Sequence, residues 1–182
     1  MTAVEIADAV DRIAQGIIAG NESLDSVVLL GILRRGRPLA DRLAMHIEKF
    51  TRVHLRVGSL ATTLYRDDLR SGAGAAKIQP HQTHFDFDVN GVTVILVDDV
   101  IASGRTVRAA LDELMDYGRP ARVQLACLID RGLRELPIQA DYLGLSISTD
   151  MGDHIAVRLD EMDYEDVVLL ERSGPADEMD FA

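Results

Sequence analysis

The chain has 182 residues, a length that fits one domain with a sizeable hydrophobic core. Hydrophobic residues make up 47% of it, but no apolar run approaches the roughly 18 residues that a membrane-spanning helix needs. The single cysteine, Cys127, cannot form an internal disulfide, and the polar start of the chain does not read as a signal peptide. We therefore expect a soluble, cytoplasmic protein in which Cys127 is a small buried hydrophobic residue.

The net charge of −11 is concentrated at the C-terminal end of the chain. Residues 150–182 hold 11 acidic residues and 2 arginines, a net of −9, whereas residues 1–149 carry a net of only −2. Such a molecule is repelled by nucleic acid at long range, although its body can still carry a local basic patch. We expect a single domain over residues 1–172, followed by an acidic, frayed tail at 173–182.

The first half of the chain alternates helical and extended patterns. Thr2 and Glu5 form a capping-box pattern before the first run of apolar residues at helical spacing, which predicts a helix that ends near Gly20-Asn21. The continuous apolar run at 27–32 predicts a buried strand, and Pro38 suits the first turn of a second helix. Alternation at 53–57 predicts a strand with one wetter face. The apolar residues that define the two helices are Ile6, Val10, Ile13, Ile17, Leu39, Leu43 and Ile47.

The second half continues the alternation after a segment without clear periodicity, residues 65–90. This segment contains a Gly/Ala-rich stretch, and its length and polarity are typical of a flexible lid. Strands that alternate with helices predict a parallel α/β sheet flanked by helices, with ligands beyond the carboxyl ends of the strands. The predicted elements are strands at 92–97 and 123–129, a helix at 106–117, and short strands near 155–159 and 167–170.

The most informative stretch follows the apolar run at 92–97. Asp98 and Asp99 end that run, and a short loop of small, donor-rich residues precedes the next helix: Ala102, Ser103, Gly104, Arg105 and Thr106. Carboxylates at a strand end can accept hydrogen bonds from ribose hydroxyls or bind Mg²⁺ through water, and the N–H groups at a helix start attract phosphate. A simple strand end and turn is the alternative, but two adjacent buried acids cost free energy without a cation or hydroxyl partner. The stretch resembles the 5-phosphoribosyl-1-diphosphate (PRPP) motif of type I phosphoribosyltransferases.

A second strand-to-helix connection is rich in arginine. Residues 31–38 contain glycines for close backbone approach and three arginines in four positions: Arg34, Arg35 and Arg37. Such a loop suits a pyrophosphate group, which needs several donors, whereas on its own it could be a solvated basic turn.

Several blocks of the sequence resemble the PyrR family, the pyrimidine-operon regulators that also have uracil phosphoribosyltransferase activity. The resemblance runs from about residue 4 to about residue 171, and the blocks at 65–68 and 134–138 point to this family within the superfamily. The matching blocks are Thr-Leu-Tyr-Arg-Asp-Asp-Leu (63–69), Val-Ile-Leu-Val-Asp-Asp-Val (94–100), Gly-Arg-Thr-Val-Arg-Ala (104–109), Gly-Arg-Pro (118–120), Asp-Arg-Gly (130–132), Arg-Glu-Leu-Pro-Ile (134–138) and Ala-Asp-Tyr-Leu-Gly (140–144).

The resemblance implies a type I phosphoribosyltransferase fold with a parallel core sheet, a flexible lid and a small hood. It implies conversion of uracil and PRPP to UMP and diphosphate with Mg²⁺, and homodimers or assemblies of dimers. Asp98 and Asp99 would meet the ribose hydroxyls and the metal, directly or through water or substrate. The other implied roles are 5′-phosphate binding by Ala102, Ser103, Gly104, Arg105 and Thr106, diphosphate binding by Arg34 and Arg35, catalytic closure from the lid by Tyr65 and Arg66, and uracil binding by Arg131 and the backbone near Ile155 and Val157.

The sequence departs from RNA-binding members of the family, which need basic and polar residues on the first helix and after Asp-Arg-Gly. Here only Arg12 and Arg134 remain as bases at the matching positions. The other matching positions are Ala7, Asp8, Asp11, Gln15, Gly20, Leu133, Gln139 and Leu145. Because each lost phosphate contact lowers affinity, we expect weak or absent binding of leader RNA.

Three functions stay open at this point. The resemblance favours a PyrR-like uracil phosphoribosyltransferase with PRPP, uracil and UMP as ligands, and leaves open whether it regulates pyrimidine genes. A regulator that senses UMP or UTP, acts on a protein or DNA partner and turns over little is the second. A purine phosphoribosyltransferase would share the PRPP motif, but the blocks at 65–68 and 134–138 argue against it.

Overall fold

The computed structural model describes residues 1–62 and 82–172. The expected lid tip, the lid residues Tyr65 and Arg66 and the expected tail therefore lie outside the described residues. Within the described part of the chain, no helix has the length and hydropathy to cross a membrane.

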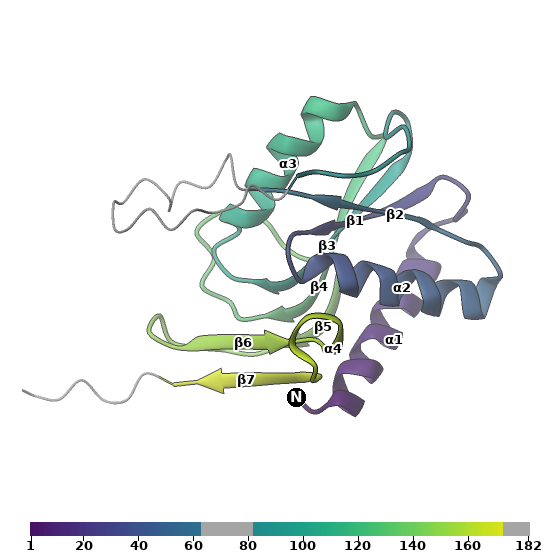
Figure 1. Ribbon diagram of the computed structural model, residues 1–182. Coiled ribbons are helices and arrows are strands. Elements are labelled where there is room, and N and C mark those ends of the chain that lie inside the picture. Colours follow the sequence, from purple (N-terminus) through teal and green to yellow (C-terminus); the bar gives the residue numbers. More distant parts are fainter. Residues whose placement is uncertain (63–81, 173–182) are drawn as a thin grey trace, which may run out of the picture.

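Five parallel strands form the central sheet, in the order β2-β1-β3-β4-β5 (Figure 1). After the first helix the chain enters the sheet at β1, moves out to the edge strand β2 and returns to β3 on the other side of β1. The strand order therefore reverses between β1 and β3, which is where such sheets bind ligands. The strands are β1 (Val27–Ile32), β2 (Arg56–Leu60), β3 (Thr93–Ile101), β4 (Arg122–Asp130) and β5 (Tyr142–Ser146).

Helices cover both faces of this sheet, as Figure 1 shows. α1 (Ala3–Gly20) and α2 (Gly36–Thr51) pack on one face, where their apolar stripes form a core cluster with Leu29, Ile95 and other strand residues. α3 (Arg105–Tyr117) packs on the other face against a second cluster around Leu30 and Leu96. The alternation of side chains along β1 and β3 supplies both clusters, so the sheet is buried on both sides.

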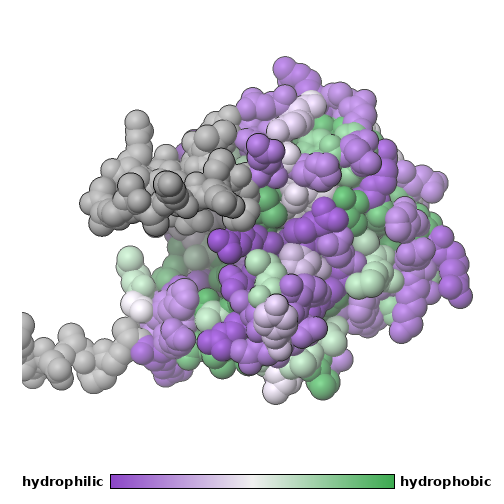
Figure 2. Space-filling view, in the orientation of Figure 1, coloured by the Kyte–Doolittle hydropathy of each residue, from purple (hydrophilic) through white to green (hydrophobic). Residues whose placement is uncertain are grey.

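A small antiparallel sheet lies beside the main body and forms the hood, residues 154–171. It consists of β6 (His154–Arg158), the short helix α4 (Asp160–Asp163) and β7 (Val167–Glu171). Ile155 and Val157 point into the same core cluster as α1 and α2, so the hood is packed against the body and is not a separate unit. The face in Figure 2 is mostly hydrophilic, with hydrophobic residues in small separate areas.

The predicted fold class, a parallel α/β sheet flanked by helices, is confirmed. Two boundaries were wrong. The strand predicted at 53–57 begins only at Arg56, because Arg52 takes a left-handed conformation that ends α2 and residues 53–55 connect the two elements. The strand predicted at 92–97 continues to Ile101, so both acids lie inside β3. The strand β5 and the helix α4 were not predicted.

Gly31 and Gly36 let the loop after β1 pack directly on β3. A Cβ at Gly36 would lie 2.1 Å from the carbonyl oxygen of Val97, and a Cβ at Gly31 would lie 2.4 Å from the Cα of Arg37. Both neighbours are backbone atoms and cannot turn away as a side chain would. The two glycines therefore determine how closely the arginine loop approaches the strand that carries Asp98.

Arg42 on α2 ties the hood to the body. Its guanidinium donates to the Glu161 carboxylate at 2.7 and 2.6 Å and to the Asp166 carboxylate at 3.0 and 2.7 Å. The Arg42 side chain is only 15% exposed. These hydrogen bonds lower the pKa of both carboxyls, in opposition to partial burial, which raises it.

We expect Gly36→Ala to lower the free energy of unfolding by about 1–3 kcal/mol, because the new methyl group would clash with the Val97 carbonyl. Urea unfolding measures this change. Gly91→Asn is the control, since a Cβ at Gly91 would meet no described atom within 4 Å and asparagine tolerates the left-handed conformation of Gly91. Equal stabilities for the two variants would contradict the close approach.

We expect Arg42→Gln to cost about 1–3 kcal/mol of unfolding free energy at pH 7, because two hood acids lose their shared partner. The fold lowers the pKa of Glu161 and Asp166, so this contribution is present above the usual carboxyl pKa of about 4. It is lost as the pH falls through the lower folded values. Urea unfolding at neutral pH and at about pH 3 tests both statements.

Arg158→Gln is the matched control for Arg42→Gln, because the Arg158–Glu165 pair also lies on the hood but its side chains are 45% and 49% exposed. Removing an exposed pair should change the unfolding free energy much less than removing the shared partner of two hood acids. The predicted role of Arg42 in holding the hood is wrong if the two variants lose the same stability, or if the loss in Arg42→Gln does not depend on pH.

Candidate functional site

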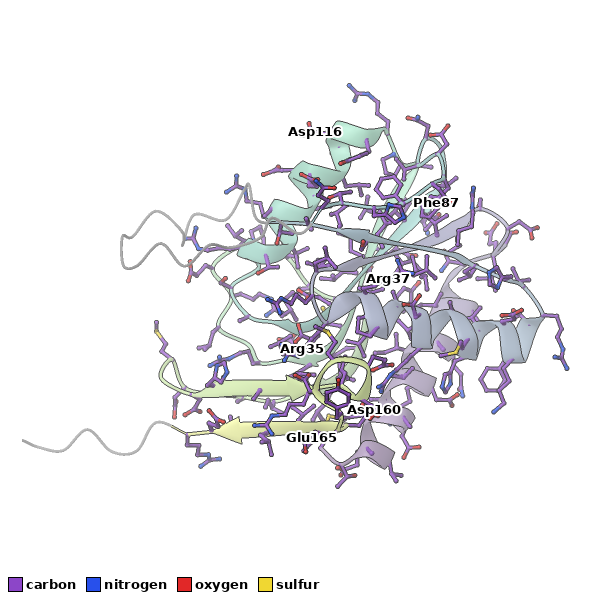
Figure 3. All side chains as sticks on the ribbon, in the orientation of Figure 1. Arg35, Arg37, Phe87, Asp116, Asp160 and Glu165 are labelled. Atoms are coloured by element: carbon purple, nitrogen blue, oxygen red, sulfur yellow. The ribbon has the colours of Figure 1, made fainter. Side chains whose placement is uncertain are left out.

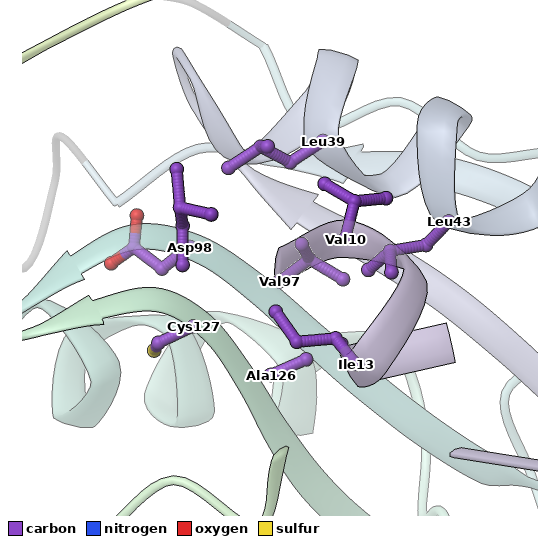
Figure 4. Close-up of a pocket in the computed structure, with 9 residues that line it drawn as sticks. Val10, Ile13, Leu39, Leu43, Val97, Asp98, Ala126 and Cys127 are labelled. Carbon is purple, nitrogen blue, oxygen red and sulfur yellow. The ribbon is translucent and has the colours of Figure 1, made fainter. Parts of the chain in front are cut away.

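The two acids lie near the carboxyl end of β3, next to closely packed apolar side chains. Asp98 is 6% exposed, and its Oδ1 accepts a hydrogen bond from the Asp99 N–H at 3.0 Å. A cavity of only about 10 Å³ lies beside it, no larger than a single water needs. Figure 4 shows the apolar side chains that line this cavity, with the Asp98 carboxylate turned away from them. The packing below the carboxylate fixes its position.

Cys127 lies directly beside Asp98 on the neighbouring strand β4. Its side chain is buried, as expected for a small hydrophobic residue. Burial raises the pKa of the thiol well above its usual range, and the nearby carboxylates of Asp98 and Asp99 raise it further. The thiol therefore stays protonated at neutral pH and packs as an apolar group, without a nucleophilic or metal-binding role.

The loop after β3 leads directly into the start of α3. Gly104 is the N-cap residue and has a φ of +90°, a conformation that favours glycine. Gly104 has no side chain that could cap the helix, and the first turn of α3 contains no acidic residue. The Ser103 hydroxyl accepts a hydrogen bond from the Arg105 N–H at 3.3 Å. No carboxylate in the first turn of α3 neutralises the positive end of its helix dipole. This end therefore suits a phosphate group.

The arginine loop lies at the end of the neighbouring strand. β1 and β3 pair in parallel with Gly31 opposite Val97, so the loops that follow them meet at one edge of the sheet. Arg34 is exposed. The Arg35 guanidinium donates to both oxygens of Asp163 on α4, at 3.1 and 3.2 Å, while its buried Nε has no hydrogen-bond partner among the described residues. Figure 3 labels Arg35 at the start of α2, on the side of the hood.

Asp163 was not identified from the sequence as a neighbour of the site. A hydrogen bond from the Leu159 N–H is the main cause that lowers the pKa of its carboxyl, and Arg35 lowers it further. Asp163 is therefore ionised at neutral pH and opposes the Arg35 charge. Any phosphate group that binds Arg35 must compete with this carboxylate or share the guanidinium with it.

An open pocket of about 350 Å³ lies beside the loop after β3. Arg131, one of the predicted base-binding residues, lines it. The Arg131 guanidinium donates to the Thr149 hydroxyl at 3.0 Å and to the carbonyls of Asp150 and Asp153 at 3.0 and 2.8 Å, so it ties the loop before β6 to the pocket wall. The full set of lining residues is Ala102, Ser103, Arg131, Leu133, Arg134, Glu135 and Met151.

The predicted base-binding residues of β6 turn their side chains away from any ligand. Ile155 and Val157 are 7% and 3% exposed and belong to the core. Any contact of Ile155 and Val157 with a base would therefore be made by their backbone groups, and this contact stays a prediction. The described residues thus bring three groups to the same end of the sheet. They are the two acids, the loop before α3 (102–106, called the phosphate loop below) and the loop after β1 (33–37, the arginine loop). Tyr65 and Arg66 lie outside the described residues.

Comparisons with known proteins agree with this geometry. A phosphoribosyl transferase domain model matches residues 2–162. The chain is 52% identical over 163 residues to the bifunctional protein PyrR of Roseiflexus sp., covering 90% of this chain and 88% of that protein. It is 45% identical over 175 residues to the bifunctional protein PyrR of Thermus thermophilus, covering 96% of each.

Solved structures of more distant proteins share the fold. The hypoxanthine phosphoribosyltransferase of Trypanosoma cruzi superposes with a TM-score of 0.68 at 19% identity, covering 96% of this chain and 95% of that one. A hypoxanthine-guanine phosphoribosyltransferase of Bacillus anthracis gives a TM-score of 0.63 at 19% identity, covering 83% and 82%. At such low identity the likeness concerns the fold alone. The domain match and the high identity over most of the chain together establish that this phosphoribosyltransferase belongs to the PyrR family.

Proposed function

We propose that the chain is a uracil phosphoribosyltransferase that converts uracil and PRPP to UMP and diphosphate. The observation that carries this proposal is the meeting of three groups at one sheet edge. They are the Asp98-Asp99 pair of β3, the start of α3 with no acidic residue in its first turn, and the arginine loop after β1. PRPP has three matching parts: a ribose with two hydroxyls, a 5′-phosphate and a diphosphate.

In this reaction N1 of uracil forms a bond to C1 of the ribose while the bond from C1 to the diphosphate oxygen breaks, and N1 loses its proton. Asp98 and Asp99 accept hydrogen bonds from the ribose hydroxyls, and the backbone of residues 102–106 binds the 5′-phosphate. Arg34 and Arg35 face the diphosphate, where they stabilise the negative charge that the leaving group gains. Arg131 and the β6 backbone frame the base, and the roles of Tyr65 and Arg66 implied by the family resemblance stay predictions.

The donor set at the end of β3 fits Mg²⁺. No group of three or more His, Cys, Asp or Glu side chains within the described residues could bind a metal alone. Mg²⁺ commonly binds through one or two carboxylates together with substrate phosphates and water, which is what Asp98 and Asp99 can offer. When bound with PRPP, Mg²⁺ would supply positive charge to the departing diphosphate.

Uracil is favoured over a purine by the relatives rather than by the fold. Proteins named PyrR match at 45–52% identity over most of the chain, whereas the purine enzymes match at only 15–20%. A purine phosphoribosyltransferase is the second candidate, because that fold is shared. A sensor with little turnover is the third candidate, and a turnover assay separates the three.

Turnover should be measured with PRPP, Mg²⁺ and uracil, hypoxanthine or guanine in parallel. We expect UMP to form, and Asp98→Asn and Asp99→Asn each to lower kcat/KM by about 10- to 100-fold, because the ribose hydroxyls lose a charged acceptor. Asp112→Asn on the exposed side of α3 is the control and should keep full activity. Full activity in both β3 variants would show that the acids do not have the proposed role. Faster turnover of a purine than of uracil would make the purine the substrate.

We also propose that leader RNA binds weakly or not at all. Both remaining bases on the expected surface already make internal hydrogen bonds: Arg12 donates to the Gly144 carbonyl at 2.9 Å, and Arg134 donates to four acceptors. Asp8 is exposed on α1, the helix that carries Arg12, and Asp11 is half-buried on that helix beside His46. A net charge of −11 adds repulsion at long range.

A filter-binding titration with the pyrimidine-operon leader of the source organism, with and without UMP, tests this expectation. We expect a Kd above about 1 μM at physiological salt, in the range of non-specific binding. The charge-reversing variant Asp8→Lys/Asp11→Lys serves as a comparison and should bind RNA more tightly. A nanomolar Kd for the unchanged protein that UMP strengthens, with a steep salt dependence, would mean that the chain uses another basic surface. The expected homodimer also stays a prediction.

A further inference from the structure

Arg134 connects the loop after β4 to the loop before α3. Its Nη1 donates to the Ala102 carbonyl at 2.7 Å, its Nη2 to the Asp130 carboxylate at 2.6 Å and its Nε to the Ile138 carbonyl at 2.7 Å. The Arg134 and Asp130 side chains are 21% and 20% exposed. One half-buried guanidinium thus fixes three segments at the edge of the pocket.

The residues that follow Arg134 extend the same contact. The N–H groups of Glu135 and Leu136 both donate to the Ser103 carbonyl, at 3.1 and 3.0 Å. The Glu135 side chain pairs with Arg105 at 2.7 Å, in an exposed position. Two successive carbonyls of the phosphate loop, those of Ala102 and Ser103, are therefore bound by residues 134–136.

Binding these carbonyls also determines where the next N–H groups point. In a planar trans peptide the C=O and N–H point in opposite directions. The Ala102 carbonyl shares its peptide plane with the Ser103 N–H, and the Ser103 carbonyl shares its plane with the Gly104 N–H. With both carbonyls turned toward residues 134–136, both N–H groups turn away from them, at the start of α3 where a phosphate is expected.

We propose that Arg134 is a positioning residue for the 5′-phosphate of PRPP. It acts through the Ala102 carbonyl, which orients the N–H donors of the loop before any ligand binds. The inference rests on the proposed binding of that phosphate by residues 102–106. Donors that are already oriented bind a ligand without a free-energy cost for reorganisation. Loss of the guanidinium therefore weakens phosphate binding, although Arg134 itself does not contact the phosphate.

The test uses three ligands that divide the site: PRPP, ribose 5-phosphate and magnesium diphosphate, each titrated by calorimetry. Arg134→Gln should weaken PRPP and ribose 5-phosphate by about tenfold, the effect of losing one charge-assisted hydrogen bond. It should leave the affinity for magnesium diphosphate, which has no 5′-phosphate, within about twofold. Equal weakening of all three ligands would mean a general loss of structure and would overturn the proposal.

Arg134→Lys separates geometry from charge. Lysine keeps the positive charge but lacks the planar fork that reaches three segments at once, so we expect it to bind PRPP as weakly as Arg134→Gln does. Wild-type affinity in Arg134→Lys would show that only the charge attracts PRPP and would overturn the proposal. Arg122→Gln is the matched control, because Arg122 is the first residue of β4, at the end of that strand opposite to the loop that carries Arg134. It should bind all three ligands normally.

Asp130→Asn provides a second route should Arg134→Gln fail to fold. It leaves the guanidinium in place but removes its charged acceptor, and it should weaken ribose 5-phosphate by a few-fold while sparing magnesium diphosphate. Unchanged ribose 5-phosphate binding in Asp130→Asn and Arg134→Gln, with normal binding by the wild type, would defeat this inference alone. A wild-type protein that does not bind PRPP would defeat the proposed function as well.

Discussion

The parallel pairing of β1 with β3 places the two acids and the arginine loop at the same end of the sheet. It puts Gly31 opposite Val97, one residue before the first acid, and so brings two strand-to-helix loops to the same edge. Gly31 and Gly36 permit the backbones to touch, and a side chain at Gly36 would separate the arginine loop from the acids. Since α2 and α3 begin at these two loops and lie on opposite faces of the sheet, their positive ends point to the same end of the sheet from two sides.

Arginines hold the outer parts of the molecule to this centre. Arg42 and Arg35 bind acids on the hood, Arg131 binds the loop before β6, and Arg134 binds the phosphate loop. These contacts add to the apolar packing between the same segments, and forked donors fix their relative orientation. Part of the acidity of the C-terminal region is therefore structural. The hood acids Glu161, Asp163 and Asp166 are partners of arginines in the body.

The sequence predicted those features that depend on neighbours along the chain. Apolar periodicity predicted α1, α2, α3 and most strands, and the local pattern at 98–106 marked the two acids and the loop before α3 as candidate site residues. Features that depend on distant contacts were missed. Asp163 lies 128 residues from Arg35, and Arg134 lies 32 residues from Ala102, so no local pattern connects them.

The strand β5 was missed for a different reason. It is short and contains Gly144, which weakens a strand pattern. The structure explains the glycine, since a Cβ there would lie 2.5 Å from the Leu128 carbonyl oxygen on β4. The β2 boundary was wrong because the left-handed turn at Arg52, a residue type that rarely adopts it, leaves no clear trace in sequence.

The burial of Cys127 beside Asp98 has a chemical consequence beyond packing. Oxidants and disulfides react with thiolates, and both burial and the neighbouring carboxylates oppose thiolate formation there. The carboxylates that oppose thiolate formation are those proposed to meet ribose and metal. Cys127 is therefore a poor target for oxidants, although it lies beside the two acids.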